Sequence, residues 1–106
     1  MRFNVAMETA GANCRGINGT VTQVLDEGLL VDRIIGEGLP DEEHSTILLK
    51  GVPQGKAVDD GIFVRAYPIG LFSYTTVNQS KNTIHAWTAD LHYAVAYYLT
   101  NPISSR

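Results

Sequence analysis

The residues of this chain that can carry chemistry are three histidines, a single cysteine and several clustered acids. His44 follows Asp41, Glu42 and Glu43, which together offer imidazole and oxygen ligands for zinc or for a hard cation. Clustered acids in an exposed loop are normally solvated, however, and a metal site usually draws its ligands from several elements. We therefore predict no bound metal and no cofactor.

The cysteine, the other two histidines and Asp60 give little indication of nucleophilic or acid–base catalysis. A catalytic pair of Cys14 with a histidine would need a third orienting group and an oxyanion site, and the sequence indicates neither. Asp60 lies in Asp59-Asp60-Gly61, which has the composition of a turn. His85 and His92 fit structural roles on a strand and a helix. We expect no catalytic residues, and a small hydrolytic enzyme using His44, His85 or Asp60 is the least favoured of three function classes.

Aromatic side chains and arginine give a stronger functional signal, because Tyr, Trp and Arg dominate the energetics of protein interfaces. Alternation along residues 62–68 places Arg65 between Phe63 and Tyr67. An arginine flanked by rings can equally form a cation–π contact within its own protein. The candidate binding residues are Phe63, Arg65, Tyr67, Trp87, Tyr93 and Tyr97.

Composition limits the class of partner. The 106 residues carry a net charge of -3, and the eight Lys and Arg are scattered, which disfavours nucleic acid. No apolar run approaches the ~20 residues that a membrane span requires. The single cysteine excludes an internal disulfide. We expect a soluble domain that is stabilised by packing and has no membrane partner.

Short apolar runs separated by turn residues predict a mainly β domain. Strands are expected at 17–25, 28–35, 46–52, 62–68, 70–77 and 83–89. Five or six short antiparallel strands suit a small OB-like or SH3-like barrel. Residues 1–14 are expected to be a flexible N-terminal arm or an edge strand, and residues 15–106 to form a single domain.

The C-terminal segment changes to the period of a helix. One stripe is formed by Leu91, Ala94, Val95, Tyr98 and Leu99, which predicts a helix over about 88–100. A helix of this length is too short to be stable alone, so it must dock on the strands. Its other faces carry Tyr93, Ala96 and Tyr97 where a surface helix normally carries charge.

Pro68 is expected to decide which way the neighbouring rings point. Its fixed φ suits a type I turn, and Gly70 would supply the left-handed residue of a bulge. The core face of this hairpin would carry Ile62, Val64, Ala66, Phe72, Tyr74 and Thr76. Its outer face would carry Phe63, Arg65, Tyr67, Leu71, Ser73, Thr75 and Val77. A slip of one residue would instead gather Phe63, Tyr67, Phe72 and Tyr74 beside Arg65 as an aromatic platform.

These surfaces predict a non-catalytic protein-interaction or assembly module that self-associates or joins a larger assembly. The uncharged helix face and the aromatic–arginine strand face would both leave apolar area exposed on a monomer, and such area commonly marks contacts. The alternative is a barrel that binds a small-molecule ligand. It would stack an oligosaccharide or a single-stranded nucleic acid on Phe63, Tyr67 and Trp87.

Overall fold

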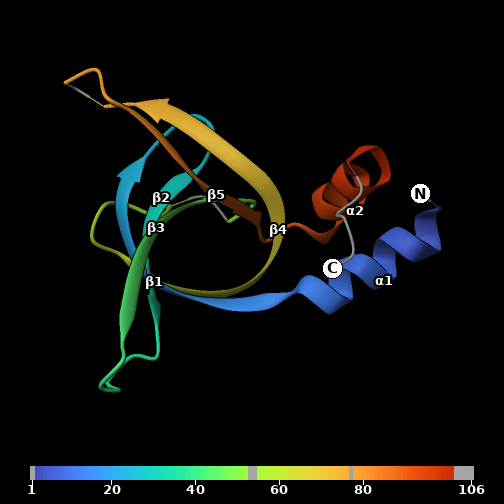
Figure 1. The fold of residues 1–106 in the computed structure, drawn as a ribbon, viewed down its shortest axis with the longest axis horizontal. Helices are drawn as coiled ribbons and strands as arrows, with labels where there is room; N and C mark the ends of the chain where they lie inside the picture. The colour runs from blue at the N-terminus through green and yellow to red at the C-terminus, as the bar shows by residue number, and fades with distance from the viewer. Residues whose placement is uncertain (1, 53–54, 77, 102–106) are drawn as a thin grey trace.

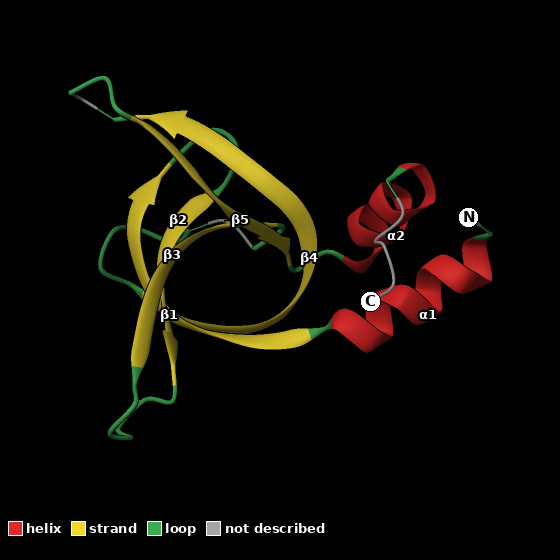
Figure 2. Cartoon of the chain, in the orientation of Figure 1, coloured by secondary structure: helices red, strands yellow, loops and turns green. Residues whose placement is uncertain are grey.

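The computed structural model describes residues 2–52, 55–76 and 78–101. Within these residues five strands close into a ring, and two helices lie together beside it (Figures 1 and 2). In chain order the elements are α1 (Phe3–Asn13), β1 (Arg15–Val24), β2 (Leu29–Ile35), β3 (Glu43–Lys50), β4 (Gly61–Thr75), β5 (Lys81–Thr88) and α2 (Leu91–Thr100). The prediction of a mainly β fold with a short C-terminal helix is confirmed.

The strands are hydrogen-bonded in the order β1-β2-β3-β5-β4, and β4 returns to β1 to complete the ring. β1 and β4 each change their pairing partner along their length. In β1, residues 15–20 pair with β4 and residues 19–24 pair with β2, so Gly19 pairs with both strands. In β4, which has 15 residues, the first half pairs with β1 and the second half with β5.

One pair of strands departs from the antiparallel sheet that we predicted. β3 and β5 run parallel, with Leu48 opposite Ala86, whereas the other four pairs are antiparallel. A parallel pair needs a long crossover between its strands. Here residues 51–80 connect the two strands, and half of these residues form β4.

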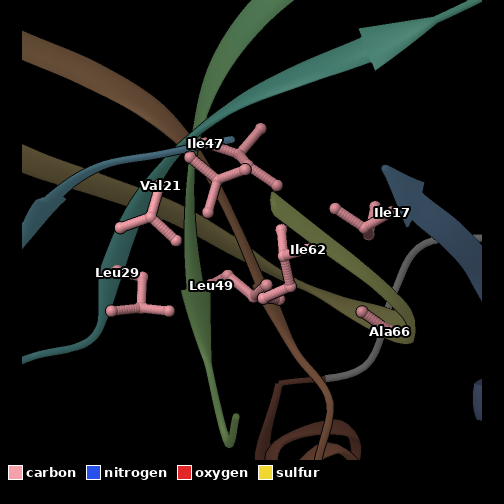
Figure 3. Packing of buried hydrophobic residues seen from close by; sticks show 8 residues of the cluster. Ile17, Val21, Leu29, Ile47, Leu49, Ile62 and Ala66 are labelled. Atoms are coloured by element: carbon pink, nitrogen blue, oxygen red, sulfur yellow. The ribbon is translucent and has the colours of Figure 1, made fainter. Parts of the chain in front are cut away.

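Side chains from all five strands meet inside the ring. The cluster consists of Ile17, Val21, Leu29, Val31, Ile47, Leu49, Ile62 and Ala66, with Trp87 of β5 partly buried against it (Figure 3). Alternation along each strand sends every second side chain to this face. Full burial of a side chain of this kind contributes about 1.5–3 kcal/mol, so the cluster supplies a large share of the folding free energy.

The opposite face of the same strands carries a second cluster. Leu30, Leu48 and Ala86 are neighbours across β2, β3 and β5, and all three are buried together with Ile69 of β4. The side chains packed against this cluster include Phe72, Tyr74 and Ile84. Coverage of both faces explains the continuous apolar runs in β2 and β3.

The predicted hairpin at Pro68 is wrong, because β4 continues through it from Gly61 to Thr75. Pro68 and Gly70 instead form an irregularity in the pairing with β5, between Pro68 and Leu71, where Gly70 has a φ of 95°. Proline is tolerated in a sheet at such a bulge because no ladder hydrogen bond is required from its nitrogen.

The bulge also changes which residues share a face. Ile62 and Ala66 lie in the ring interior, whereas Phe72 and Tyr74 pack against the second cluster, so the expected common core face does not form. The outer set is exposed as predicted at Phe63, Arg65, Leu71, Ser73 and Thr75, while Tyr67 is half-buried. Val77 lies outside the described residues.

The expected flexible arm or edge strand at residues 1–14 is instead the helix α1. Its buried residues, Ala6 and Ala10, are four apart and face the buried Ala94 and Val95 of α2. Small side chains on both helices allow close packing, so α2 stabilises a segment that has no side-chain cap of its own. Neither described helix is long and apolar enough to cross a membrane.

Candidate functional site

Phe63 and Arg65 lie on the outer face of β4, next to β1. Phe63 is 76% exposed, and its ring packs beside Gly16, where an added Cβ would lie 3.6 Å from the ring. Gly16 pairs with Arg65 across the β1–β4 ladder, so both exposed residues of β4 lie beside this glycine. These two candidate binding residues form an exposed patch on β4.

The three candidate tyrosines lie near the helices and differ in exposure. Tyr67 and Tyr97 are half-buried against the cluster of α1 and α2, and the Tyr97 ring meets Tyr98 edge-on at 5.8 Å. Tyr93 is 44% exposed, with the Lys50 ammonium 5.4 Å from its ring centroid. Tyr67 and Tyr97 therefore serve packing, and Tyr93 alone among the three presents much of its ring to solvent.

Trp87 packs on the opposite side of the sheet from Phe63, against the ring interior. Arg33 of β2 lies over the Trp87 ring, with its Cζ 4.9 Å from the centroid. The Nε of Arg33 and the Nε1 of Trp87 are both buried and lack a hydrogen-bond partner within the described part of the chain. Two neighbouring buried donors without acceptors are unusual, because most buried polar groups are paired.

Arg33 was not among the residues that we predicted, although β2 contained a signal. Leu29, Val31 and Arg33 alternate, so the arginine shares the face of two residues that are buried in the ring. The fold thus places Phe63 and Trp87 on different faces and Tyr67 beneath the helices. The shared surface needed for stacking on these three residues is not formed.

A shallow apolar groove runs between α1 and α2. Its volume is about 200 Å³, and it is lined by Phe3, Met7, Leu91, His92, Val95, Ala96 and Leu99. Phe3 is 65% exposed and Met7 is 37% exposed. The sequence pattern of α2 indicated an apolar surface here, but the contribution of α1 was missed.

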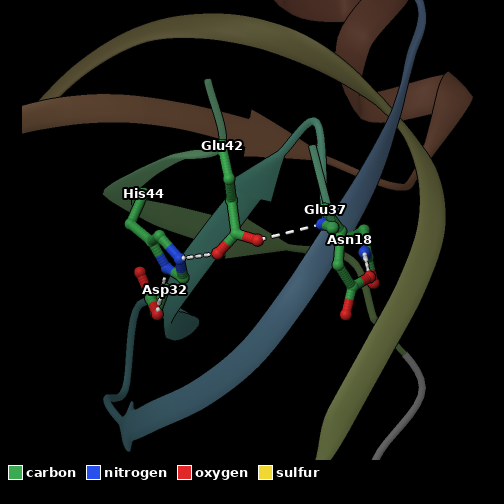
Figure 4. Close-up of polar contacts among 6 residues, drawn as sticks. Asn18, Asp32, Glu37, Glu42 and His44 are labelled. Carbon is green, nitrogen blue, oxygen red and sulfur yellow. Dashed lines mark hydrogen bonds and ion pairs between the residues drawn. The ribbon is translucent and has the colours of Figure 1, made fainter. Parts of the chain in front are cut away.

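His44 lies at the β2–β3 end of the sheet and bonds two carboxylates (Figure 4). Its Nδ1 is 3.0 Å from Asp32 Oδ2, and its Nε2 is 2.5 Å from Glu42 Oε2. Glu42 also accepts a hydrogen bond from the Gly38 backbone N–H. The hydrogen bonds from His44 to Glu42 and then Asp32 raise the pKa of the imidazole above its ordinary value of 6.5.

Neither His85 nor Asp60 forms a hydrogen bond with His44 in the described part of the chain. His85 is exposed on β5, and the Asp60 carboxylate accepts a hydrogen bond from the Ala57 backbone N–H in the turn before β4. Asp32 and Glu42 occupy the two different nitrogens of His44, so they flank the ring instead of converging on one point. Among the described residues, no three His, Cys, Asp or Glu side chains are arranged to hold a metal ion.

We expect His44 to titrate above 6.5 and its raised pKa to fall when either partner carboxylate is neutralised. The Glu42→Gln and Asp32→Asn variants remove the interactions that favour the charged imidazole, and NMR of the His44 Hε1 resonance against pH measures the change. The ion pairs stabilise the fold below pH 6.5, and this contribution is lost as the pH rises through the folded pKa.

Glu43→Gln is the matched control, because Glu43 is adjacent in sequence and has no recorded bond to His44. A midpoint that moves equally in Glu43→Gln and Glu42→Gln would contradict the assignment of the shift to the bonded carboxylate.

Comparison of the chain with protein-family models, with curated proteins and with solved structures found no match.

Proposed function

We propose that this protein is a non-catalytic assembly module that self-associates through the paired helices α1 and α2. The supporting observation is the apolar groove between the helices, where Phe3 and Met7 remain accessible. An apolar surface left open on a monomer commonly marks a protein contact. The Phe63 and Arg65 patch offers a second surface through which a larger assembly can grow.

A second copy of the chain fits this groove better than a charged partner does. No residue of α2 is charged, and Glu8 is the only charged residue of α1. A surface with so little charge offers little electrostatic guidance toward a different protein. Two copies can bury the same patch against itself in a symmetric dimer, the commonest arrangement of soluble oligomers.

We also assign the ring to the OB-like type that the sequence suggested, in preference to the SH3-like type. The strand order β1-β2-β3-β5-β4, in which β4 crosses from β1 to β5, fits a five-stranded Greek-key arrangement. This likeness concerns architecture alone and carries no function, because many functions share such folds.

Sedimentation equilibrium tests the self-association. The wild-type chain is expected to show a mass of at least twice its 11.6 kDa, which moves toward the monomer value on dilution. Phe3→Glu and Met7→Glu each place a charge in the groove, and we expect both variants to be monomeric because an unpaired charge cannot be buried cheaply.

Leu39→Glu is the matched control, because Leu39 is 59% exposed in the connection between β2 and β3 and takes no part in the groove. Its mass should equal that of the wild type. A wild-type protein that stays monomeric at several hundred micromolar would overturn the proposal. Association that survives both groove substitutions would overturn the assignment to the helices.

A further inference from the structure

The strongest unused feature of the structure is Arg33 stacked on Trp87 beside the ring interior. Both side chains are only partly buried as a whole, so solvent reaches them, yet Arg33 Nε and Trp87 Nε1 are covered and have no hydrogen-bond partner among the described residues. The two groups only donate hydrogen bonds, so they cannot satisfy each other. Within residues 2–52, 55–76 and 78–101, no acceptor is bonded to either of these two donors.

Arg15 places a second positive charge on the face of β1 that borders the ring interior. It lies two residues before the buried Ile17 on β1 and therefore on the same face of the strand. Its Nη1 donates to the carbonyls of Ala12 and Cys14, which tethers the side chain to the end of α1. Burial first, and the charge of Arg15 second, lower the pKa of Arg33, as expected for two nearby cations.

No carboxylate balances these charges in the described part of the chain. The ion pairs found there both belong to His44, with Asp32 and Glu42. Glu43 lies on the same face as Arg33, near the end of β3, but forms no ion pair with either arginine. The direct partners of Arg33 across the sheet carry no charge, because they are Ser45 of β3 and Gly19 of β1.

We infer that Arg33, Trp87 and Arg15 form a binding site for a phosphate group, either free or carried by a small molecule. A phosphate oxygen can accept from the remaining N–H groups of the Arg33 guanidinium, which are not covered as Nε is, while Arg15 supplies a second positive charge. The stacking of Arg33 on Trp87 holds the guanidinium plane in place, which reduces the ordering needed when the ligand binds. This site is separate from the helix groove.

The chain has one tryptophan, so its intrinsic fluorescence reports directly on this site. We expect inorganic phosphate, at ionic strength held constant with sodium chloride, to change Trp87 emission saturably and to raise the melting temperature. Arg33→Gln is expected to weaken binding by about tenfold or more, because it removes a charge-assisted hydrogen bond. Arg15→Gln should weaken it in the same direction.

Arg65→Gln is the matched control. This substitution removes the same charge as Arg33→Gln, but Arg65 is exposed on the outer face of β4. It should leave phosphate affinity near that of the wild type. Arg33→Lys keeps the charge but loses the planar donor group, so weaker binding in this variant supports the stacked geometry. Circular dichroism spectra that match the wild type establish that each variant is folded.

A nucleoside monophosphate distinguishes the two sources of the phosphate. Tighter binding than inorganic phosphate, still dependent on Arg33, would assign the group to a nucleotide, and equal binding would assign it to free phosphate. The inference is overturned if neither probe gives a saturable signal, or if Arg33→Gln and Arg65→Gln lose affinity equally. Because these variants leave Phe3 and Met7 intact, failure here does not bear on self-association.

Discussion

Replacement of Tyr98 by alanine is expected to cost about 3–5 kcal/mol of unfolding free energy, as removal of a large buried aromatic side chain does. Tyr98 is completely buried between the helices and β4, and its hydroxyl donates to the Pro68 carbonyl over 2.5 Å. A domain of this size has only about 5–15 kcal/mol of stability, so the variant should lose a large fraction of it. Urea denaturation followed by circular dichroism measures the loss.

Two further tyrosine variants separate packing from hydrogen bonding. Tyr98→Phe keeps the ring and removes the hydrogen bond to the Pro68 carbonyl, which should cost about 0.5–1.5 kcal/mol. Tyr93→Ala is the matched control on the same helix, because Tyr93 is 44% exposed, and we expect it to cost less than about 1 kcal/mol. Equal losses in Tyr98→Ala and Tyr93→Ala would contradict the anchoring role of Tyr98.

Tyr98 also predicts a loss of stability at alkaline pH. Burial, with smaller contributions from Tyr97, Cys14 and Tyr67, raises the pKa of Tyr98 to about 12 from 10.0. Its neutral form therefore stabilises the fold fully below pH 10, and this contribution is lost as the pH approaches 12. The Tyr98→Phe variant should lack this component of the alkaline transition.

Substitution of Gly19 by alanine is expected to destabilise the fold by about 3 kcal/mol, at the upper end of the cost of overpacking. An added Cβ would lie 2.2 Å from the backbone oxygen of Asp32 and 2.9 Å from Val31 Cγ1. Because the obstacle is the backbone of β2, no side-chain rotation relieves it. The clash falls where β1 pairs with both β2 and β4, so relief by strand movement would open the ring.

Gly61→Ala provides the matched control for Gly19→Ala. Gly61 begins β4, and an added Cβ there meets nothing within 4 Å. We expect its melting temperature to stay close to that of the wild type, whereas Gly19→Ala should melt about 10 °C lower. A Gly19→Ala protein as stable as Gly61→Ala would show that β1 and β2 do not approach each other as closely as described.

The positions of the strands and of α2 could be predicted from the sequence, but the pairing of the strands could not. Alternation located segments of all five strands, and the stripe containing Val95 and Tyr98 located α2. The hairpin expected at Pro68 was wrong, because a closely spaced proline and glycine suit a hairpin turn and a strand bulge equally well. Which of these forms depends on β1 and β5, which pair with the two halves of β4.

Some features of the candidate site could likewise be predicted from local sequence, whereas others depend on tertiary contacts. Exposure of Phe63 and Arg65, and the uncharged surface of α2, follow from periodicity within one element, which depends on near neighbours in the chain. Three other features join residues far apart in sequence. They are the contact of Arg33 with Trp87, the packing of α1 on α2, and the pairing of Gly19 with both β2 and β4. Those contacts depend on which strands pair and in what register, and only the closure of the ring selects among the pairings that the same alternating strands allow.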